Sequence, residues 1–328
     1  MGLRLYIFRR IVVSFVLILS VITVDFIICV ALPGRPMDAY VFSLKGRITK
    51  ERYDALAKHF GLDKPLYEQY LINLRNLITW DFGQSWTGAG QGICEEIINK
   101  LLNTILLLGP ATILSIIIGI FLGTLCAYKK GSFIDTILTL GSMAISCVPS
   151  FFFAWIILFI FTIKLGWFPS FPLISSRETP PNVLEIITQK VYCSILPMVT
   201  LVLFSVGGWI LFARACVLET ITEDYVITAR AKGLGELTVL YKHVLKNASL
   251  PLITYIALSF GFMVGGAIIV ETIFNYDGMG LLIWNSIQGI PDLPMLYAIF
   301  YVLAICVIMA NFIADLLYGI IDPRIRYG

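Results

Sequence analysis

Long apolar runs alternate along the chain with shorter polar segments. A helix needs about 20 apolar residues to cross the hydrocarbon core of a bilayer. The runs that meet this length predict six transmembrane helices, at residues 11–32, 103–128, 133–163, 194–217, 250–274 and 296–321. The third run is longer than a single crossing needs and contains Pro149, so we expect a kink or an offset start there. The pattern predicts an all-α membrane protein.

Lys and Arg residues are distributed unevenly between the polar segments. Cytoplasmic loops of membrane proteins carry an excess of these residues. One set of segments holds Arg4, Arg9, Arg10, Lys129, Lys130, Arg214, Arg230, Lys232, Lys242, Lys246, Arg324 and Arg326, whereas the short loops of the other set hold Lys164, Arg177 and Lys190. We therefore expect both termini to be cytoplasmic.

The polar segments also suggest how the chain is divided. Residues 1–32 form an N-terminal segment with the first span, residues 33–102 an extracytoplasmic helical loop, and residues 103–328 a five-span core with a cytoplasmic loop at residues 218–249. Apolar stripes at helical spacing predict two helices in the extracytoplasmic loop. One stripe contains Tyr53, Leu56, Ala57 and Phe60, and the other contains Leu66, Tyr70, Leu71 and Leu74. We expect a helical cap that rests on the mouth of the bundle.

Composition supports the membrane class and weakens other classes. Of 328 residues, 58% are hydrophobic and 14% are charged, against about 25% charged in soluble domains. The net charge of +3 does not indicate a nucleic-acid partner. The seven cysteines form no CxxC pair, so neither a metal site nor a disulfide framework is expected.

A charged segment at residues 223–243 interrupts the apolar pattern. Residues 228–232 are compatible with a helix, Gly233 interrupts it, and a helical pattern then resumes. Its expected apolar face consists of Leu237, Leu240, Tyr241, Val244 and Leu245. The small side chains of Ala229 and Ala231 would allow another surface to come close. The segment therefore predicts a helix, a glycine turn and a second helix that dock on a partner, with a basic helix lying on lipid headgroups as the alternative.

Ionisable residues within apolar runs are functional candidates by default. Asp25 lies in the first span, where it would line a path or bond to a neighbouring helix, and Glu271 lies at the end of the fifth. Gly278 and Gly280 follow Glu271 and suggest a tight re-entrant turn. Small-residue faces at Gly119–Gly123, Gly207–Gly208 and Gly261–Gly265–Gly266 are typical of helix packing in membranes.

The sequence contains no recognisable catalytic site. It has no GxxxxGK[ST] phosphate loop, no HExxH and no GxSxG motif, and its two histidines, His59 and His243, fall in separate loops. If ATP drives the function of this chain, its hydrolysis is therefore expected on another polypeptide.

Several stretches together resemble the inner-membrane permease subunits of binding-protein-dependent ABC importers of the dipeptide/oligopeptide type. They are YIFRRIVVSFVLILSV at 6–21, FGLDKPLYEQYLINL at 60–74, VPSFFFAWIILFIFTIKLGWFP at 148–169, EDYVITARAKGL at 223–234, HVLKNASLP at 243–251, VETIFNYDGMGLL at 270–282 and DLLYGIIDPRIRY at 315–327. The similarity covers nearly the whole chain. It implies a type I importer fold in the cell membrane, with half of a translocation pathway formed by this subunit.

The resemblance also implies partners and site residues. It assigns Tyr225, Ala229, Arg230, Ala231, Lys232, Gly233 and Leu234 to coupling with a cytoplasmic ATPase subunit, and Glu271, Asp277, Gly278 and Gly280 to an outer gate or path. Asp25 is a further path candidate because it is ionisable within a span, and it departs from the family, which usually has an apolar or hydroxyl residue there. The implied partners are a second homologous permease subunit in a heterodimer, two ATPase subunits that bind ATP and Mg²⁺, an extracytoplasmic binding protein and membrane lipid. This chain itself is expected to bind no cofactor.

Two alternatives stay open at this point. The same machine could import oligosaccharides, because both cargoes are polar and delivered by a binding protein. An ion-driven secondary transporter is the alternative from a different class, although such proteins tend to contain inverted repeats and no internal repeat is evident here.

Overall fold

The computed structural model describes residues 3–31, 58, 64–85, 92–169, 182–263, 265–289 and 291–321. Most of these residues lie in helices. In chain order the helices are α1 (Leu3–Ala31), α4 (Leu66–Thr79), α5 (Ile93–Tyr128), α6 (Phe133–Cys147), α7 (Ser150–Leu158), η1 (Phe159–Lys164), α8 (Val183–Ile221), α9 (Asp224–Ala231), α10 (Glu236–Thr238), η3 (Val239–Val244), α11 (Leu245–Met263), α12 (Ile268–Ile273), α13 (Met279–Ile287) and α14 (Leu293–Ile321). η1 and η3 are π-helical turns that continue the helices before them.

Within the described residues, five helical stretches are long and apolar enough to cross a membrane. They are Ile7–Ile28, Ile93–Tyr128, Ile187–Ile221, Glu236–Gly261 and Leu293–Ile313. A sixth crossing is possible if the bent pair Phe133–Cys147 and Ser150–Lys164 counts as one span. The expectation of a multi-pass helical membrane protein is confirmed.

The third predicted span contains the expected irregularity, in a stronger form than a kink. α6 and the α7–η1 helix meet at an angle of 94°. Val148, which precedes Pro149, adopts an extended conformation with φ −84° and ψ 127°. A residue before proline is disfavoured in the helical region, and proline has no N–H to continue the helix. The sequence Val148-Pro149 therefore breaks the helix in two.

The fifth predicted span is shifted along the chain. It was expected at residues 250–274, but the helix runs from Glu236 through η3 and α11 and ends at Met263. Gly266 then adopts a left-handed φ of +73°, which is accessible to glycine, and α12 begins separately at Ile268. The second half of the expected loop at 218–249 thus belongs to a long helix.

Among the described helices, the most extensive contact joins α5 to α8, and it depends on glycine. A Cβ added at Gly119 would lie 2.2 Å from the Cβ of Trp209, and one at Gly123 would lie 2.5 Å from the carbonyl oxygen of Ile210. Any larger residue would push the two helices apart, as in small-residue interfaces of other membrane helices. The predicted packing role is confirmed for both glycines. Gly208, in contrast, has no atom within 4 Å of its Cβ position.

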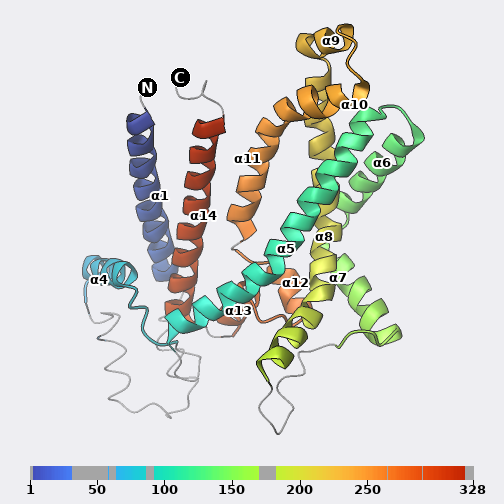
Figure 1. Ribbon diagram of the computed structural model, residues 1–328. Helices are drawn as coiled ribbons and strands as arrows, with labels where there is room; N and C mark the ends of the chain where they lie inside the picture. Colours follow the sequence, from blue (N-terminus) through green and yellow to red (C-terminus); the bar gives the residue numbers. More distant parts are fainter. Residues whose placement is uncertain are drawn as a thin grey trace.

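The bundle has two distinct ends (Figure 1). The start of α1, the end of α14 and α9 lie at one end, and α4, α13 and the start of α5 lie at the other. The helix predicted from the stripe of Leu66, Tyr70, Leu71 and Leu74 is present as α4, beside the end of α1. The other predicted helix of this loop, with Tyr53 and Phe60, lies outside the described residues.

Candidate functional site

A helix–turn–helix element projects from one end of the bundle (Figure 1). α9 begins at Asp224, three residues after α8 ends, and α10 begins at Glu236. The turn between them contains Gly233, whose φ of +77° lies in the left-handed region that favours glycine. An ion pair between Arg230 Nε and Glu236 Oε1, 3.1 Å apart, spans the turn.

The inner face of this element is fixed firmly to the bundle. Val226 is fully buried and Ala229 is 4% exposed, and both belong to one apolar cluster with residues of α5, α8 and α11. Burial of the Val226 side chain stabilises the packed state by roughly 1.5–3 kcal/mol, and burial of the Ala229 methyl group by about 0.8 kcal/mol. The element is therefore a rigid extension of the bundle, and movement of the element would be transmitted to α8 and α11.

The outer face of the element is exposed and partly apolar. The exposed large side chains are those of Tyr225, Ile227, Leu234, Leu237 and Tyr241. Of the residues proposed from sequence for coupling, Tyr225, Arg230, Ala231, Lys232, Gly233 and Leu234 are exposed, whereas Ala229 points inward. Ala229 can therefore contribute only by letting α9 pack closely on the bundle.

The expected apolar face of the second helix was partly wrong. Leu237 and Tyr241 were expected to share one face with Leu240 and Val244, but Leu237 and Tyr241 are exposed. Leu240, Val244 and also Val239 are buried. A π-helical turn at Val239–Val244 is the reason. Its wider winding changes the phase of the side chains relative to an α-helix.

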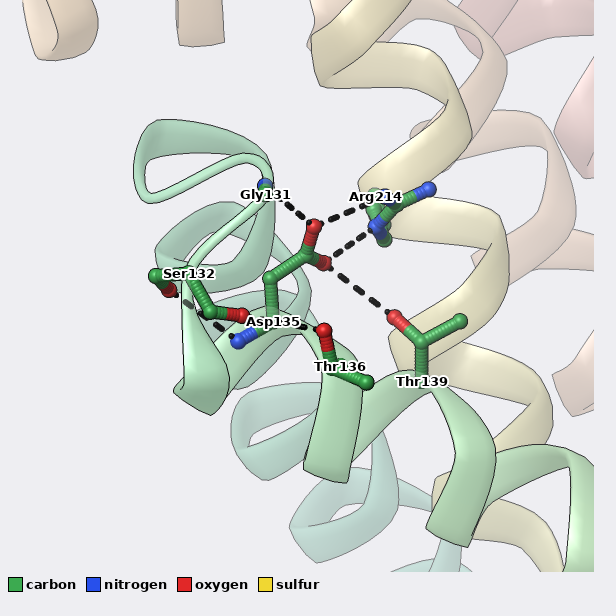
Figure 2. A network of polar contacts seen from close by, with 6 residues as sticks. All are labelled: Gly131, Ser132, Asp135, Thr136, Thr139 and Arg214. Carbon is green, nitrogen blue, oxygen red and sulfur yellow. Dashed lines mark hydrogen bonds and ion pairs between the residues drawn. The ribbon is translucent and has the colours of Figure 1, made fainter.

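An ion pair joins Asp135 of α6 to Arg214 of α8 (Figure 2). Asp135, at the start of α6, is 4% exposed and accepts hydrogen bonds from Arg214 Nε at 2.7 Å and Nη2 at 3.0 Å. The backbone N–H of Gly131 and the hydroxyl of Thr139 also donate to this carboxylate, at 3.0 and 3.2 Å. The network ties the α5–α6 turn to α8, ten residues before α9 begins.

Sequence reasoning missed this pair. Arg214 was counted only as a loop charge, and Asp135 was not considered. A local signal was available, because Ser132 and Asp135 have the spacing of a capping box, and the Ser132 hydroxyl does accept a bond from the N–H of Asp135. The long-range partner Arg214 has no such local signal.

At the other end of the bundle, Glu271 is fully buried, and hydrogen-bond donors surround its carboxylate. One carboxylate oxygen accepts bonds from the Thr104 hydroxyl and the Ala267 N–H, both at 3.2 Å, and the other accepts one from the Leu281 N–H at 3.1 Å. A Cβ at Gly278 would lie 2.5 Å from this second oxygen. The carboxylate thus holds the α12–α13 turn against α5.

Asp277 extends this cluster toward the surface. Its carboxylate lies 2.5 Å from Lys100 Nζ, and its backbone carbonyl accepts a bond from Asn103 Nδ2 at 2.7 Å. Tyr276 donates to the carbonyl of Asn103 at 3.0 Å. Asn103, Thr104 and Lys100 all come from α5, so one stretch of α5 holds the whole turn.

The structure brings together Glu271, Asp277, Gly278 and Gly280, which were candidates for an outer gate, and places Asp25 elsewhere. Asp25 lies in α1, which packs mainly on α14 and α4. Among the described residues, no three His, Cys, Asp or Glu side chains are placed to hold a metal ion.

Comparison with known proteins adds the family context. The family model for the inner membrane component of binding-protein-dependent transport systems matches residues 115–327. The chain is 35% identical to the oligopeptide transport system permease protein AppB of Bacillus subtilis over 322 residues, which cover 98% of this chain and 99% of the relative. It is 32% identical to a putative peptide permease protein of Brucella suis over 323 residues, with 98% of both chains covered. It is also 32% identical to the dipeptide transport system permease protein DppB of Alkalihalophilus pseudofirmus over 337 residues, with coverages of 98% and 99%.

Proposed function

The chain belongs to the family of inner membrane components of binding-protein-dependent transport systems, and on this premise we propose that it is a permease subunit of an ATP-driven importer of short peptides. The observation that carries the cargo class is the full-length similarity to relatives described as oligopeptide and dipeptide permeases. No feature of the described residues favours oligosaccharides over peptides.

The α9–α10 element supports coupling to an ATPase subunit. Its inner face is buried and fixes the element to α8 and α11. Its outer face is exposed and contains Tyr225 and Leu234. We assign docking to Tyr225, Arg230, Ala231, Lys232, Gly233 and Leu234, and inward support to Ala229. In this proposal ATP and Mg²⁺ bind to two partner subunits, because the chain has no phosphate-binding loop.

The Glu271 cluster supports a gate at the opposite end. It joins the α12–α13 turn to α5 through buried bonds to Thr104, and through the more exposed Lys100–Asp277 pair. Movement of α5 relative to α8 would pull on this turn. We propose that the turn, with Asp277, Gly278 and Gly280, borders the extracytoplasmic mouth, where a binding protein delivers the peptide.

The remaining parts of the proposal concern topology and assembly. The α9 element and both ends of the chain would be cytoplasmic, in agreement with the excess of Lys and Arg at that end. A second, homologous permease subunit would complete the translocation pathway. Closure of the ATPase subunits would then alternate access between the two sides.

Purification from the native membrane in mild detergent tests the assembly. Mass spectrometry should recover two ATPase chains, a second permease and a binding protein with this chain. The purified complex is then reconstituted into vesicles. It should take up labelled di- to pentapeptides only when ATP is present on the side of the membrane that carries the ATPase subunits. Labelled oligosaccharides serve as the competing cargo.

The outcomes separate the alternatives. ATP-dependent uptake of oligosaccharides without peptide uptake would show that the protein is a permease subunit of an ATP-driven importer whose cargo is oligosaccharide. Uptake that follows an ion gradient and needs no ATPase would overturn the importer and favour a secondary transporter.

A further inference from the structure

Helix α4 carries more apolar surface than its packing buries. Tyr70, Leu74 and Leu77 pack into the apolar cluster shared by α1, α5, α13 and α14. Tyr67, Leu71 and Ile78 are 65%, 57% and 64% exposed. A small amphipathic helix that merely covers other helices would direct polar side chains outward.

The exposed apolar side chains form a line along the helix. Leu71 follows Tyr67 by four residues and Ile78 follows Leu71 by seven, which places all three on one side. This stripe, Tyr67–Leu71–Ile78, borders the buried face. The polar side chains of Glu68 and Thr79 lie on another side of the helix, where Glu68 pairs with Lys64 at 3.6 Å and Thr79 bonds to the carbonyl of Arg75 at 2.9 Å.

The contacts of α4 with α1 set its depth in the membrane. The Tyr70 hydroxyl lies 2.9 Å from Thr23 Oγ1, and the Tyr70 ring meets the Phe26 ring edge-on, with centroids 5.4 Å apart. Thr23 and Phe26 lie inside the apolar span Ile7–Ile28. At 1.5 Å per residue they are about 3–8 Å from the end of that span.

At this depth the surface of α1 is also apolar and exposed, at Val24, Ile27 and Ile28. An amphipathic helix in the plane of a membrane buries its apolar face by about 5–10 Å into the boundary between headgroups and acyl chains. Trp80, which follows α4 and packs partly on Phe82 while 48% exposed, adds an aromatic side chain of the kind enriched at this boundary.

We propose that the Tyr67–Leu71–Ile78 stripe of α4 is a lipid-binding surface that lies in the membrane interface beside α1. α4 then anchors the loop between the first two spans to the bilayer. In this position α4 lies to the side of the mouth of the bundle, whereas the predicted cap would rest on the mouth. The inference uses only the membrane placement of α1 and is independent of the transported cargo.

Photocrosslinking in the native membrane tests the proposal. Ile78→p-benzoylphenylalanine places a crosslinker on the stripe, and Thr79→p-benzoylphenylalanine places one on an exposed polar side one residue away. After illumination of the whole complex, mass spectrometry of the chain should find several times more lipid adducts at residue 78 than at residue 79. Leu71→p-benzoylphenylalanine provides a second stripe position and should behave as residue 78 does.

Three results would overturn the proposal. Adducts from residues 71 and 78 to a second permease would make the stripe a subunit interface. Adducts to the binding protein would make it a docking surface for that protein. The absence of lipid adducts at both positions, or equal lipid adducts at residue 79, would show that the stripe has no preferred contact with lipid.

Discussion

Asp135 and Glu271 are both buried carboxylates, and the protein accommodates them by different means. Asp135 is paired with the guanidinium of Arg214, while Glu271 accepts hydrogen bonds from a hydroxyl and from backbone N–H groups at a turn. Removal of one partner from a buried pair leaves an uncompensated charge. The two residues therefore respond differently to substitution.

Asp135→Asn should destabilise the protein strongly. The change leaves Arg214 without a counter-charge. Loss of one member of a fully buried pair costs about 3–5 kcal/mol, and the cost here should be lower because the Arg214 side chain is 25% exposed and can reach water. Thermal unfolding in detergent should show a large decrease in Tm. The matched control is Glu236→Gln, which breaks the exposed pair with Arg230 and should change stability by about 1 kcal/mol or less. Equal effects of the two variants would contradict the structural role of Asp135.

Gly278→Ala should disturb the Glu271 cluster. The added Cβ would lie 2.5 Å from a carboxylate oxygen of Glu271 and 2.6 Å from Thr104 Oγ1. Overpacking of this kind typically costs about 1–3 kcal/mol. Gly141→Ala is the control, because Gly141 lies in α6 with no atom within 4 Å of its Cβ position. We expect reduced peptide uptake and a lower Tm for Gly278→Ala, and no change for Gly141→Ala. Both quantities are measured for the two variants in reconstituted vesicles of the same composition.

At the scale of elements, breaks in the helices decide where side chains point. Val148-Pro149 divides α6 from α7, Gly266 separates α11 from α12, and the π-helical turn η3 rotates Leu237 and Tyr241 outward. The first break follows from proline chemistry and was predicted. The winding of η3 has no comparable signal in the sequence.

Gly233→Val should uncouple ATP hydrolysis from transport. Valine in the left-handed region is strained, by about 1–2 kcal/mol for an ordinary L-residue and more for a β-branched one. The turn between α9 and α10 would change, whereas no neighbouring atom lies within 4 Å of the new Cβ and the spans should stay folded. Substrate-stimulated ATPase activity and uptake report the loss.

Gly233→Asn is the matched control, since asparagine tolerates the left-handed conformation. It should retain most of the coupling. If the valine variant transports as well as the asparagine variant, the conformation of this turn has no part in coupling.

At the scale of the whole molecule, the arrangement of the helices predicts which surfaces share a side of the membrane. α4 and α9 lie at opposite ends of the bundle (Figure 1). Lys64, just before α4, and Lys232, just after α9, are both exposed. Their amines provide a test of the proposed topology without any substitution.

A membrane-impermeant amine reagent should label Lys64 in right-side-out vesicles. It should label Lys232 only in inverted vesicles stripped of the ATPase subunits, which would otherwise cover this docking residue. The reason is that loops rich in Lys and Arg stay on the cytoplasmic side of the membrane, and the end of the bundle with α9 is the end rich in these residues. Mass spectrometry identifies the labelled lysines, and detergent-solubilised protein should be labelled at both. Labelling of Lys232 in right-side-out vesicles would reverse the proposed orientation.

The amino-acid sequence by itself determined the class of the protein and most of its helices. Apolar length predicted the spans near α1, α5, α8 and α14, because the bilayer imposes this requirement on each segment separately. Pro149 predicted the break in the third span, and the glycines at 119 and 123 predicted a close contact between helices. The turn at Gly278 and Gly280, shortly after Glu271, was also predicted, but the hydrogen bonds through which the Glu271 carboxylate holds this turn were not.

Only the tertiary structure decided which distant residues meet. The pairing of Asp135 with Arg214, and of Lys100 with Asp277, joins residues far apart in the sequence. The inward position of Ala229 and the exposed stripe of α4 likewise depend on which neighbour covers each face. Local propensity acts over one or two turns of a helix, whereas burial is a property of the whole packed bundle, so no local pattern could have determined these contacts.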